Sequence, residues 1–312
     1  MGHSVGVIAS DYIAVGKVDN NSIHGTIQKI RESETDSDYD FLAEMPADDI
    51  ITRIGEQIVV VADGEQIPVV GIGFPGIIRD GIVLDSPNLQ QVKGRDLASD
   101  IATYLAGQGI DTQVFIFNDA DVLAAGVAAT YGYLDRVVRG WYLGVGIGFG
   151  RYPQSDGVWE GGHFVVTLDP KEQFCQCGGR GHLEGIMGVR AMRLRFMDME
   201  PEEVFEQARY GDKKCSDFVK LWHRALAAAT ATSVHVDGPG KFFIFGPNAR
   251  FVQVGLLDLY LQEMVKMSPL QGSHFEVIKA EDALAIIGAA INAEQATRQV
   301  EFKRELTRKV YD

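Results

Sequence analysis

The chain has 312 residues, of which 46% are apolar, and this is enough to bury a large core in one or two domains. Its formal net charge is −14 at pH 7, which argues against non-specific nucleic-acid binding, because that needs a basic face. No apolar run reaches membrane-spanning length, and the first ten residues carry no signal-peptide pattern. We therefore expect a cytoplasmic protein without nucleic-acid or membrane partners.

The N-terminal third of the sequence predicts short strands, turns and two helices. The spacing of Ile50, Ile51, Ile54 and Ile58 indicates an amphipathic helix, and apolar runs bounded by turn formers indicate hairpins. In chain order the expected elements are strands 5–9 and 12–18, a polar loop at 31–40, helix 47–61, strand 69–73, a hairpin of 77–78 with 82–84, helix 96–105 and strand 114–117.

The remaining sequence predicts further alternation of strands and helices. A helix is expected after residue 118, with Asp119 or Asp121 as its N-cap. The later elements are a strand and glycine-rich loop at 141–150, a mostly helical stretch at 201–234, strand 242–245, helix 250–267 and helix 280–308. This alternation indicates α/β architecture, and two hairpin-then-helix segments suggest two related lobes.

The most informative stretch is residues 160–184, because it holds His163, Cys175, Cys177 and His182 within twenty residues. Two thiolates and two imidazoles are the ligand types of a structural tetrahedral Zn²⁺ site. The alternative is a pair of buried free thiols beside a core histidine. Cys215 is expected to be an ordinary free thiol.

Two other patterns point to a ligand site. Asn118-Asp119 lies between a strand and a helix, where an acid could accept a proton from a substrate hydroxyl; a plain N-cap is the alternative. The run 143–150 carries alternate glycines, whose backbone N–H groups could approach a phosphate. Glu160, His163 and Glu184 would suit a ligand with several hydroxyls, unless the acids are only solvated loop charges.

Taken together, these residues resemble the ROK family of sugar kinases, within the actin-like ATPase superfamily. The resemblance covers nearly the whole chain, and the order and spacing of its motifs are specific. The matching segments are Gly71 to Gly76, Pro87-Asn88-Leu89, Asn118-Asp119-Ala120, Leu143 to Gly148, Glu160-Gly161-Gly162-His163, and the cysteine segment that ends in His182-Leu183-Glu184.

The resemblance implies an α/β, two-lobed actin-like ATPase (ribonuclease H-like) fold with a mixed sheet and flanking helices in each lobe. The N-terminal lobe would span 1–117, with a C-terminal helix at about 290–312 packed back on it. The C-terminal lobe would span 118–289 and contain a zinc knuckle at 163–182. The family's lobes close on sugar and ATP, and a homodimer is expected.

The resemblance also implies roles for single residues. Asp119 matches the catalytic base that takes the proton from the sugar hydroxyl. The residues that match sugar contacts are Gly73, Asn88, Asn118, Glu160, His163 and Glu184. Gly144, Gly146 and Gly148 match the second phosphate loop, and Gly246 belongs to the adenosine-side motif. Zinc ligands are His163, Cys175 and Cys177, with His182 where the family usually has a third cysteine.

The N-terminal segment departs from the family pattern. Where the family has an Asp-x-Gly-Gly-Thr loop for phosphate and Mg²⁺, this chain has Val7-Ile8-Ala9-Ser10-Asp11. Valine cannot bind a metal, and a carboxylate at Asp11 would repel a triphosphate. Asp121 also replaces a usual asparagine.

Two hypotheses remain open at this point. The first is an ATP-dependent hexose or N-acetylhexosamine kinase, with Mg²⁺ in doubt because of Val7 and Asp11. The second is a catalytically silent sugar-binding or sensor protein. A transcriptional repressor is disfavoured by the acidic charge and by a chain that starts directly at the first hairpin.

Overall fold

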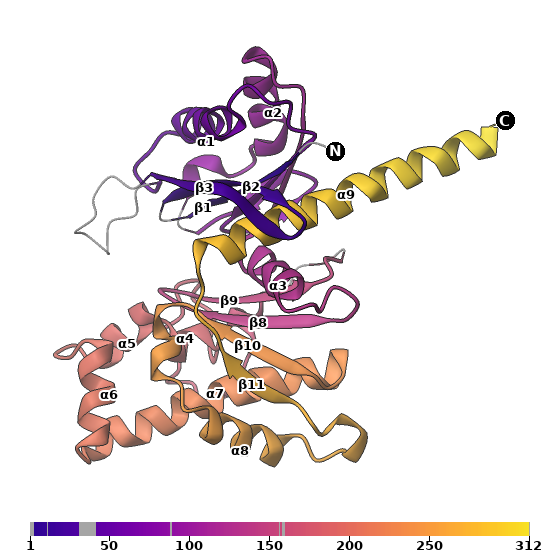
Figure 1. The fold of residues 1–312 in the computed structure, drawn as a ribbon. Coiled ribbons are helices and arrows are strands. Elements are labelled where there is room, and N and C mark those ends of the chain that lie inside the picture. The colour runs from indigo at the N-terminus through magenta and orange to yellow at the C-terminus, as the bar shows by residue number, and fades with distance from the viewer. Residues whose placement is uncertain are drawn as a thin grey trace. The chain divides into compact units, whose positions relative to one another are not determined.

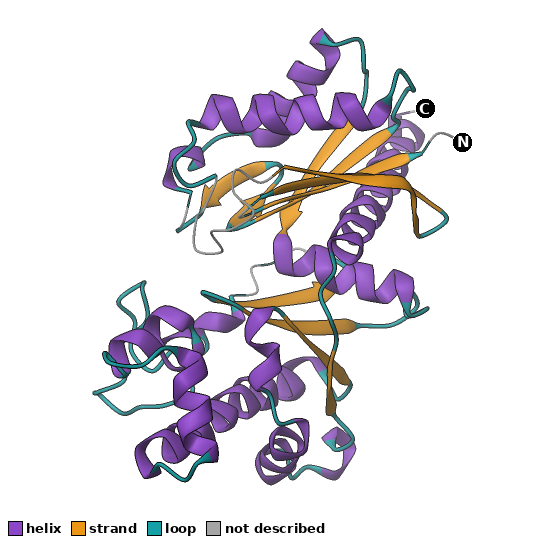
Figure 2. Ribbon diagram, turned by 60° about the vertical axis from the view of Figure 1, so that its left-hand side comes forward, coloured by secondary structure: helices purple, strands orange, loops and turns teal. Residues whose placement is uncertain are grey.

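The computed structural model describes residues 3–10, 12–30, 42–87, 89–155, 157 and 160–311, with side chains described up to residue 302. Backbone contacts divide the chain into two compact units (Figures 1 and 2). The first contains Met1–Val137, Arg151–Asp156 and Ala280–Asp312, and the second contains Val138–Gly150 and Gly157–Lys279.

The first unit is built on a mixed five-stranded sheet in the order β3-β2-β1-β4-β7. β1 pairs antiparallel with β2 and parallel with β4, which in turn pairs parallel with β7. The strands are β1 Ser4–Ala9, β2 Ile13–Asp19, β3 Ser22–Ile30, β4 Val69–Phe74 and β7 Gln113–Asn118, with a separate hairpin of β5 Ile77–Arg79 and β6 Ile82–Asp85.

Helices cover both faces of this sheet (Figure 2). Side chains of α1 Ala47–Ala62 and α2 Leu97–Gly107 join those of β1, β2 and β4 in one apolar cluster. On the other face, α9 Asp282–Tyr311 packs so closely on β1 that a Cβ added at Gly6 would lie 1.9 Å from the Ile286 carbonyl oxygen. Only a glycine at position 6 permits this approach.

The helix α3, Asp119–Thr130, also belongs to the first unit. Its backbone approaches that of α9 closely at Gly126, where an added Cβ would lie 1.9 Å from the Leu284 carbonyl oxygen. The predicted lobe boundary at 117/118 therefore differs from the division in the structure, which falls after Val137. α9 begins at Asp282, close to the predicted start at 280, and the first unit includes the chain from Ala280 rather than from about 290.

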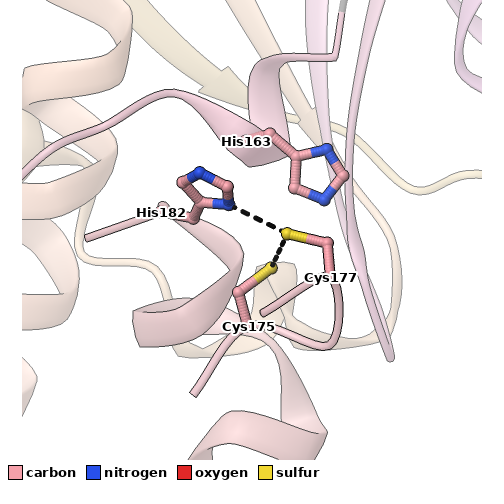
Figure 3. A group of neighbouring side chains, drawn as sticks. All are labelled: His163, Cys175, Cys177 and His182. Atoms are coloured by element: carbon pink, nitrogen blue, oxygen red, sulfur yellow. Dashed lines mark hydrogen bonds between the residues drawn. The ribbon is translucent and has the colours of Figure 1, made fainter. Parts of the chain in front are cut away.

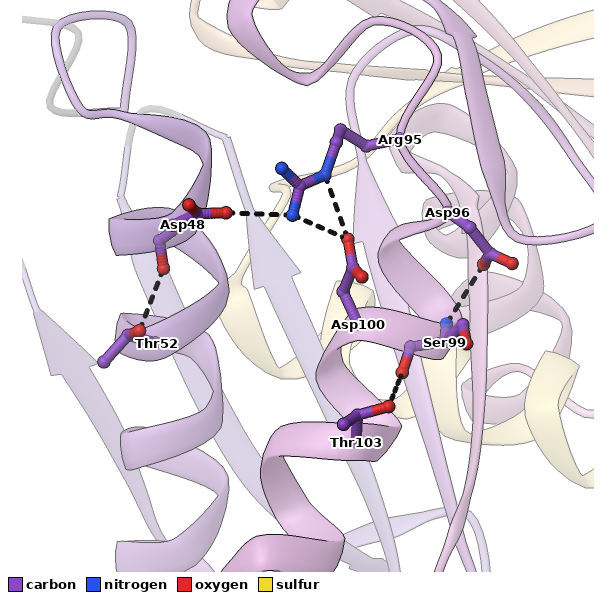
Figure 4. Close-up of polar contacts among 7 residues, drawn as sticks. All are labelled: Asp48, Thr52, Arg95, Asp96, Ser99, Asp100 and Thr103. Atoms are coloured by element: carbon purple, nitrogen blue, oxygen red, sulfur yellow. Dashed lines mark hydrogen bonds and ion pairs between the residues drawn. The ribbon is translucent and has the colours of Figure 1, made fainter.

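Charged side chains join the two outer helices of the first unit (Figure 4). Arg95 bonds Asp100 on α2 at 3.0 Å and Asp48 on α1 at 2.9 Å. The carboxylates of Asp100 and Asp48 raise the pKa of Arg95, so the guanidinium stays charged. Asp96, expected as the first residue of helix 96–105, is instead the N-cap of α2 and accepts from the Ser99 N–H at 3.0 Å.

The second unit is built on a four-stranded sheet in the order β11-β10-β8-β9, with β10 parallel to both neighbours. Its core contains Trp141 and Trp222, both fully buried. Its strands and helices are β8 Val138–Leu143, β9 Ile147–Tyr152, α4 Glu184–Met187, α5 Val189–Arg195, α6 Pro201–Arg209, α7 Lys213–Asp237, β10 Lys241–Phe245, α8 Val254–Met264 and β11 His274–Val277, with 3-10 turns η2 Gly161–His163, η3 Pro247–Phe251 and η4 Ser268–Leu270. Another 3-10 turn, η1 Gln90–Val92, belongs to the first unit.

Most expected elements are confirmed, and the differences are instructive. The stretch 201–234 is two helices, α6 and α7, separated by a turn at Gly211 with φ +91. The sequence did not predict β3, whose exposed and polar residues give no apolar run. The expected loop at 31–40 lies outside the described residues. Cys215 is buried in α7, and desolvation followed by a bond to Asp212 raises the pKa of its thiol to about 11.

Candidate functional site

Four predicted ligands converge in the second unit (Figure 3). One ligand atom from each of His163, Cys175, Cys177 and His182 lies within 4.8 Å of the other three. The two sulfur atoms are 3.4 Å apart, and Cys177 Sγ lies 3.3 Å from His182 Nδ1. The structure therefore brings the four predicted ligands together, although residues 164–174 separate the first ligand from the second.

The backbone explains how the chain returns from residue 163 to residue 182. Residues 164–166 pair with residues 181–183: the Val166 N–H donates to Gly181 at 2.8 Å, and the Leu183 N–H donates to Phe164 at 3.0 Å. Val165 and His182 form an antiparallel bridge between these bonds. This pairing brings His163 beside His182, with ring centroids 5.2 Å apart.

The charges around His163 favour a cation in the cluster. A hydrogen bond to Cys175 and then the carboxylate of Glu160 raise the pKa of His163 to about 10. Burial, followed by the charge of His163, lowers the pKa of His182, so that imidazole keeps a lone pair at neutral pH. An anionic environment that attracts a proton to His163 attracts a divalent metal ion for the same reason.

The donor set fits zinc. Zn–S bonds of about 2.3 Å and Zn–N bonds of about 2.0 Å place the atoms of a tetrahedral set roughly 3.3–3.8 Å apart. The distances between the Cys175 and Cys177 sulfur atoms and between Cys177 and His182 are close to this range. All four ligand atoms lie within 4.8 Å of one another, about 1 Å more than the longest of these separations.

Glu184 connects this cluster to the glycine-rich turn. One carboxylate oxygen accepts from the Ile147 N–H at 3.0 Å, and the other lies 3.6 Å from Cys175 Sγ. A Cβ added at Gly146 would lie 2.8 Å from the Glu184 carboxylate. The predicted sugar contact Glu184 and the predicted phosphate-loop residue Gly146 are therefore neighbours in the second unit.

Two carbonyl oxygens of the turn between β8 and β9 accept hydrogen bonds from other parts of the chain. The Asn248 amide donates to the Gly144 oxygen at 3.1 Å, and the Val189 N–H donates to the Val145 oxygen at 3.1 Å. In the part of the chain that the structure describes, the N–H groups of Val145 and Gly146 have no backbone acceptor. Free N–H groups at a glycine turn are a suitable cradle for an anion.

Gly246 packs against the backbone of the residue that precedes this turn. It has φ +92, and an added Cβ would lie 2.6 Å from the Leu143 carbonyl oxygen, directly before the turn. Gly148, by contrast, lies within strand β9 and not in the turn, so its predicted loop position is wrong. The sequence reasoning also missed Asn248 as a site residue, although its place after Gly246-Pro247 on a strand exit was visible.

Asn118 and Asp119 lie in the first unit, where β7 meets α3. The N-cap of α3 is Asn118 and not one of the acids, because Asn118 is extended and lies directly before the first helical residue. Its Oδ1 accepts from the Ala120 N–H at 2.9 Å, and Asp119 Oδ1 accepts from the same N–H at 2.9 Å. Asn118 Nδ2 donates to the Gly76 oxygen at 3.0 Å. Both ends of the Asn118 amide are thus occupied by backbone groups, which fixes the position of Asp119.

Three further predicted sugar contacts have separate outcomes. A Cβ added at Gly73 would lie 2.6 Å from Val122 and 2.9 Å from Ile8, so this glycine serves the packing of β4 against α3. Asn88 lies outside the described residues. Glu160 is half-exposed, and its carboxylate lies 3.5 Å from His163 Nδ1.

The N-terminal segment does not fit Mg²⁺ at the position where the family resemblance places a carboxylate. Val7 lies in the middle of β1, is fully buried and belongs to the apolar core. The turn to β2 is closed by a bond from the Ser10 N–H to the Tyr12 oxygen at 3.1 Å, and Asp11 lies outside the described residues. Among the described helices, none has both the length and the apolar content needed to cross a membrane.

Comparison with known proteins gives consistent matches along the chain. Residues 27–296 match the family described as the ROK family. A glucokinase from Thermotoga maritima is 32% identical, over 80% of this chain and 87% of its own length. An N-acetylmannosamine kinase from Haemophilus influenzae is 29% identical, over 74% of this chain and 79% of its own length.

Solved structures share the fold. The ROK hexokinase from Thermus thermophilus has a TM-score of 0.74 at 20% identity and covers 96% of this chain and 100% of its own. A ROK family glucokinase from Streptomyces griseus, solved with glucose and AMPPNP, has a TM-score of 0.68 at 21% identity and covers 94% and 100%. The predicted fold class, an α/β two-lobed actin-like ATPase fold, is confirmed.

Proposed function

Because this chain belongs to the ROK family, we propose that it is a sugar kinase that transfers a phosphoryl group from ATP to a hydroxyl of a hexose or N-acetylhexosamine. The relatives named glucokinase and N-acetylmannosamine kinase support this substrate class. In this proposal Asp119 is the general base for the sugar hydroxyl, and Glu160, His163 and Glu184 contact other hydroxyls.

The observation that carries the proposal is the double contact of Glu184. One oxygen meets the Ile147 N–H at the glycine turn, and the other meets Cys175 in the metal cluster. Glu184, which we propose binds a sugar hydroxyl, therefore also contacts the turn whose N–H groups suit a phosphate. Phosphoryl transfer depends mainly on positioning and charge stabilisation, which such a connection serves.

We further propose that His163, Cys175, Cys177 and His182 hold a structural Zn²⁺. The ion would stabilise the fold of residues 163–182, because the ligands are far apart in an unfolded chain. It would also fix the His163 ring, whose other nitrogen could then face a sugar hydroxyl. Elemental analysis of the purified protein should give about one zinc per chain, and its absence would end this part of the proposal.

We propose ATP as the donor and assign no step to Mg²⁺, because Val7 offers no ligand at the expected position. The silent-binder alternative rests on the same substitution. It predicts calorimetric sugar binding without turnover, whereas the kinase proposal predicts turnover with at least one hexose. A cytoplasmic homodimer is also proposed from the resemblance, and light scattering should then give roughly twice the chain mass of 34.2 kDa.

The main experiment is a coupled kinase assay over a hexose and N-acetylhexosamine panel, with ATP and with polyphosphate. Asp119→Asn should lower kcat by at least about 100-fold, because a general base supplies roughly 10²–10⁴ in rate. Calorimetric sugar binding by the same variant should persist. The control is Asp121→Asn, which places the usual family residue on the same turn and should retain activity. Turnover by Asp119→Asn at the native rate would exclude Asp119 as the base.

A further inference from the structure

A single arginine, Arg195 at the end of α5, binds both ends of the segment that carries most metal ligands. Its two terminal nitrogens bond the two Glu172 oxygens at 2.9 and 2.5 Å. One of them also lies 3.4 Å from the Gly185 carbonyl oxygen. The guanidinium carbon lies 4.5 Å from the Phe174 ring centroid and 5.4 Å from that of Phe218.

Glu172 and Gly185 enclose residues 173–184, which we call the ligand loop. It contains Cys175, Cys177 and His182 as well as Glu184. The Gly181 N–H donates to the Glu172 carbonyl oxygen at 2.7 Å, which closes the loop a second time through the backbone. Gly185 sits so near the start of the loop that an added Cβ would lie 2.9 Å from the Cys175 nitrogen.

The environment of Arg195 indicates that it determines the path of the ligand loop. The side chains of Arg195 and Glu172 are only 17% and 11% exposed, so the pair is largely removed from water. A buried ion pair is often no more stabilising than apolar residues of the same size. A bidentate pair, however, fixes two groups in one geometry. An arginine with a carboxylate, a carbonyl and two rings around it is therefore suited to defining the path of a loop.

We propose that Arg195 is a positioning residue that preorganises the ligand loop for the metal ion and holds Glu184 in place against the glycine turn. The loop then keeps its path when the ion leaves, and the ion binds without ordering the chain first. The consequence for catalysis rests on the proposed sugar-kinase function. The consequence for the loop itself does not.

A matched pair of variants on one helix tests the proposal. Arg195→Met removes the guanidinium and keeps an unbranched apolar stem. Arg193→Met removes an exposed arginine of α5, whose Nε donates to Glu200 at 2.8 Å outside the loop. Amide hydrogen exchange is followed for residues 173–184 in metal-free protein, and zinc release from loaded protein is followed with a chromophoric chelator.

The expected result is at least tenfold faster exchange across the ligand loop and at least tenfold faster zinc release in Arg195→Met, with neither change in Arg193→Met. Arg195→Lys should recover the charge but not the bidentate contact. Its rates of loop exchange and zinc release should therefore lie between those of Arg195→Met and the native protein. Sugar KM should rise in Arg195→Met more than kcat falls, since Glu184 is displaced and Asp119 is untouched. Native exchange and native zinc release in a folded Arg195→Met protein would overturn the proposal.

Two safeguards keep the outcomes distinct. If Arg195→Met does not fold, Glu172→Gln replaces it, because the amide keeps the shape of the side chain and removes only the charge. Loop exchange must then rise by at least threefold, or the proposal fails. If the native protein holds no zinc, the zinc proposal fails, while exchange in the metal-free loop still decides the role of Arg195.

Discussion

The turn between β1 and β2 and the turn between β8 and β9 occupy similar places in the two units, yet they are built differently. In the first unit, the turn is surrounded by side chains: the Tyr12 hydroxyl bonds Asp282, and Lys29 pairs with Asp282 and covers the Tyr12 ring. In the second unit, the turn consists mainly of glycine backbone, which hydrogen-bonds to Asn248, and the N–H of Ile147 after it donates to Glu184. The glycine turn leaves backbone N–H groups available for a phosphate, whereas polar side chains cover Tyr12 at the end of the first turn.

The difference begins at single positions in the strands. Val7 contributes its side chain to the core of β1, where the family resemblance leads one to expect a metal-binding acid. The second unit keeps glycine at 144, 146 and 246. We therefore expect nucleotide contacts to depend on the second unit more strongly than on the first.

The largest expected effect comes from restoring the acid in the first unit. Val7→Asp would bury an unpaired carboxylate at a fully buried site and should lower the free energy of unfolding by about 4 kcal/mol or more. Val60→Asp, at a half-exposed position on α1, should change it by no more than about 0.5 kcal/mol. Urea unfolding measures both. A stable Val7→Asp protein with faster turnover would contradict the comparison, because it would make the first turn a working metal site.

The next effect concerns the glycine behind the second turn. Gly246 and Gly211 have nearly the same φ, +92 and +91, but only Gly246 would place a Cβ against other backbone atoms. Gly211→Ala should therefore cost about 1 kcal/mol of unfolding free energy, from the left-handed conformation alone. Gly246→Ala should cost about 3 kcal/mol and should raise the KM for ATP, because its φ of +92 with ψ of 170 is a conformation that only glycine adopts readily and because the Leu143 backbone must move. Equal losses in the two variants would show that the contact with Leu143 does not matter.

A smaller effect is expected on KM values, which should respond differently to the loss of two carboxylates in the second unit. Glu160→Gln removes a charge beside His163 only, so it should raise the KM for sugar and leave that for ATP unchanged. Glu184→Gln also weakens the bond to the Ile147 N–H at the turn, so it should raise both KM values. A change of about tenfold corresponds to the roughly 1.5 kcal/mol of a charge-assisted hydrogen bond. Steady-state kinetics with each substrate varied in turn provides the measurement, and an unchanged KM for ATP in Glu184→Gln would disprove the link.

The same features explain how much the sequence could predict. The metal cluster was predictable because its ligand types are diagnostic and three of its members lie within eight residues. A returning loop or hairpin after His163 follows from the proposed cluster, but the pairing of residues 164–166 with 181–183 was not predictable, since it carries no local signal. Arg195 and Glu172 were missed for a related reason, because a buried ion pair 23 residues apart is visible only after packing.

At the level of the fold, local patterns were sufficient for the amphipathic helix α1 and the buried strand β4. They were insufficient for α3, because its assignment to the first unit depends on a crossing with α9 more than 150 residues later. They also failed for β3, where tertiary pairing with β2 overrides a polar and exposed sequence.

The smallest expected effect is a pH dependence at Gln253, which follows η3, the 3-10 turn that carries Asn248. His223 on α7 is fully buried; its Nδ1 donates to the Val219 oxygen at 2.7 Å, and its Nε2 accepts from the Gln253 N–H at 3.0 Å, where α8 begins after η3. Burial lowers the pKa of His223 below 6.5. Above pH 6.5 the imidazole is neutral in both states, so its contribution to stability is constant. Below that value the unfolded chain takes up the proton first, so the free energy of unfolding should fall, by up to about 1.4 kcal/mol per pH unit, until the pH passes the folded pKa.

Denaturant unfolding between pH 7 and pH 5 tests this expectation in the native protein, in His223→Gln and in His235→Gln. The exposed His235 makes the same bond to the carbonyl four residues earlier, but it receives no bond from α8, so His235→Gln should keep the native slope. His223→Gln should be less stable at pH 7 and should lose part of the slope, because glutamine does not titrate. If the slope were unchanged in His223→Gln, acid would act on another group, and the support of the second turn would not depend on this imidazole.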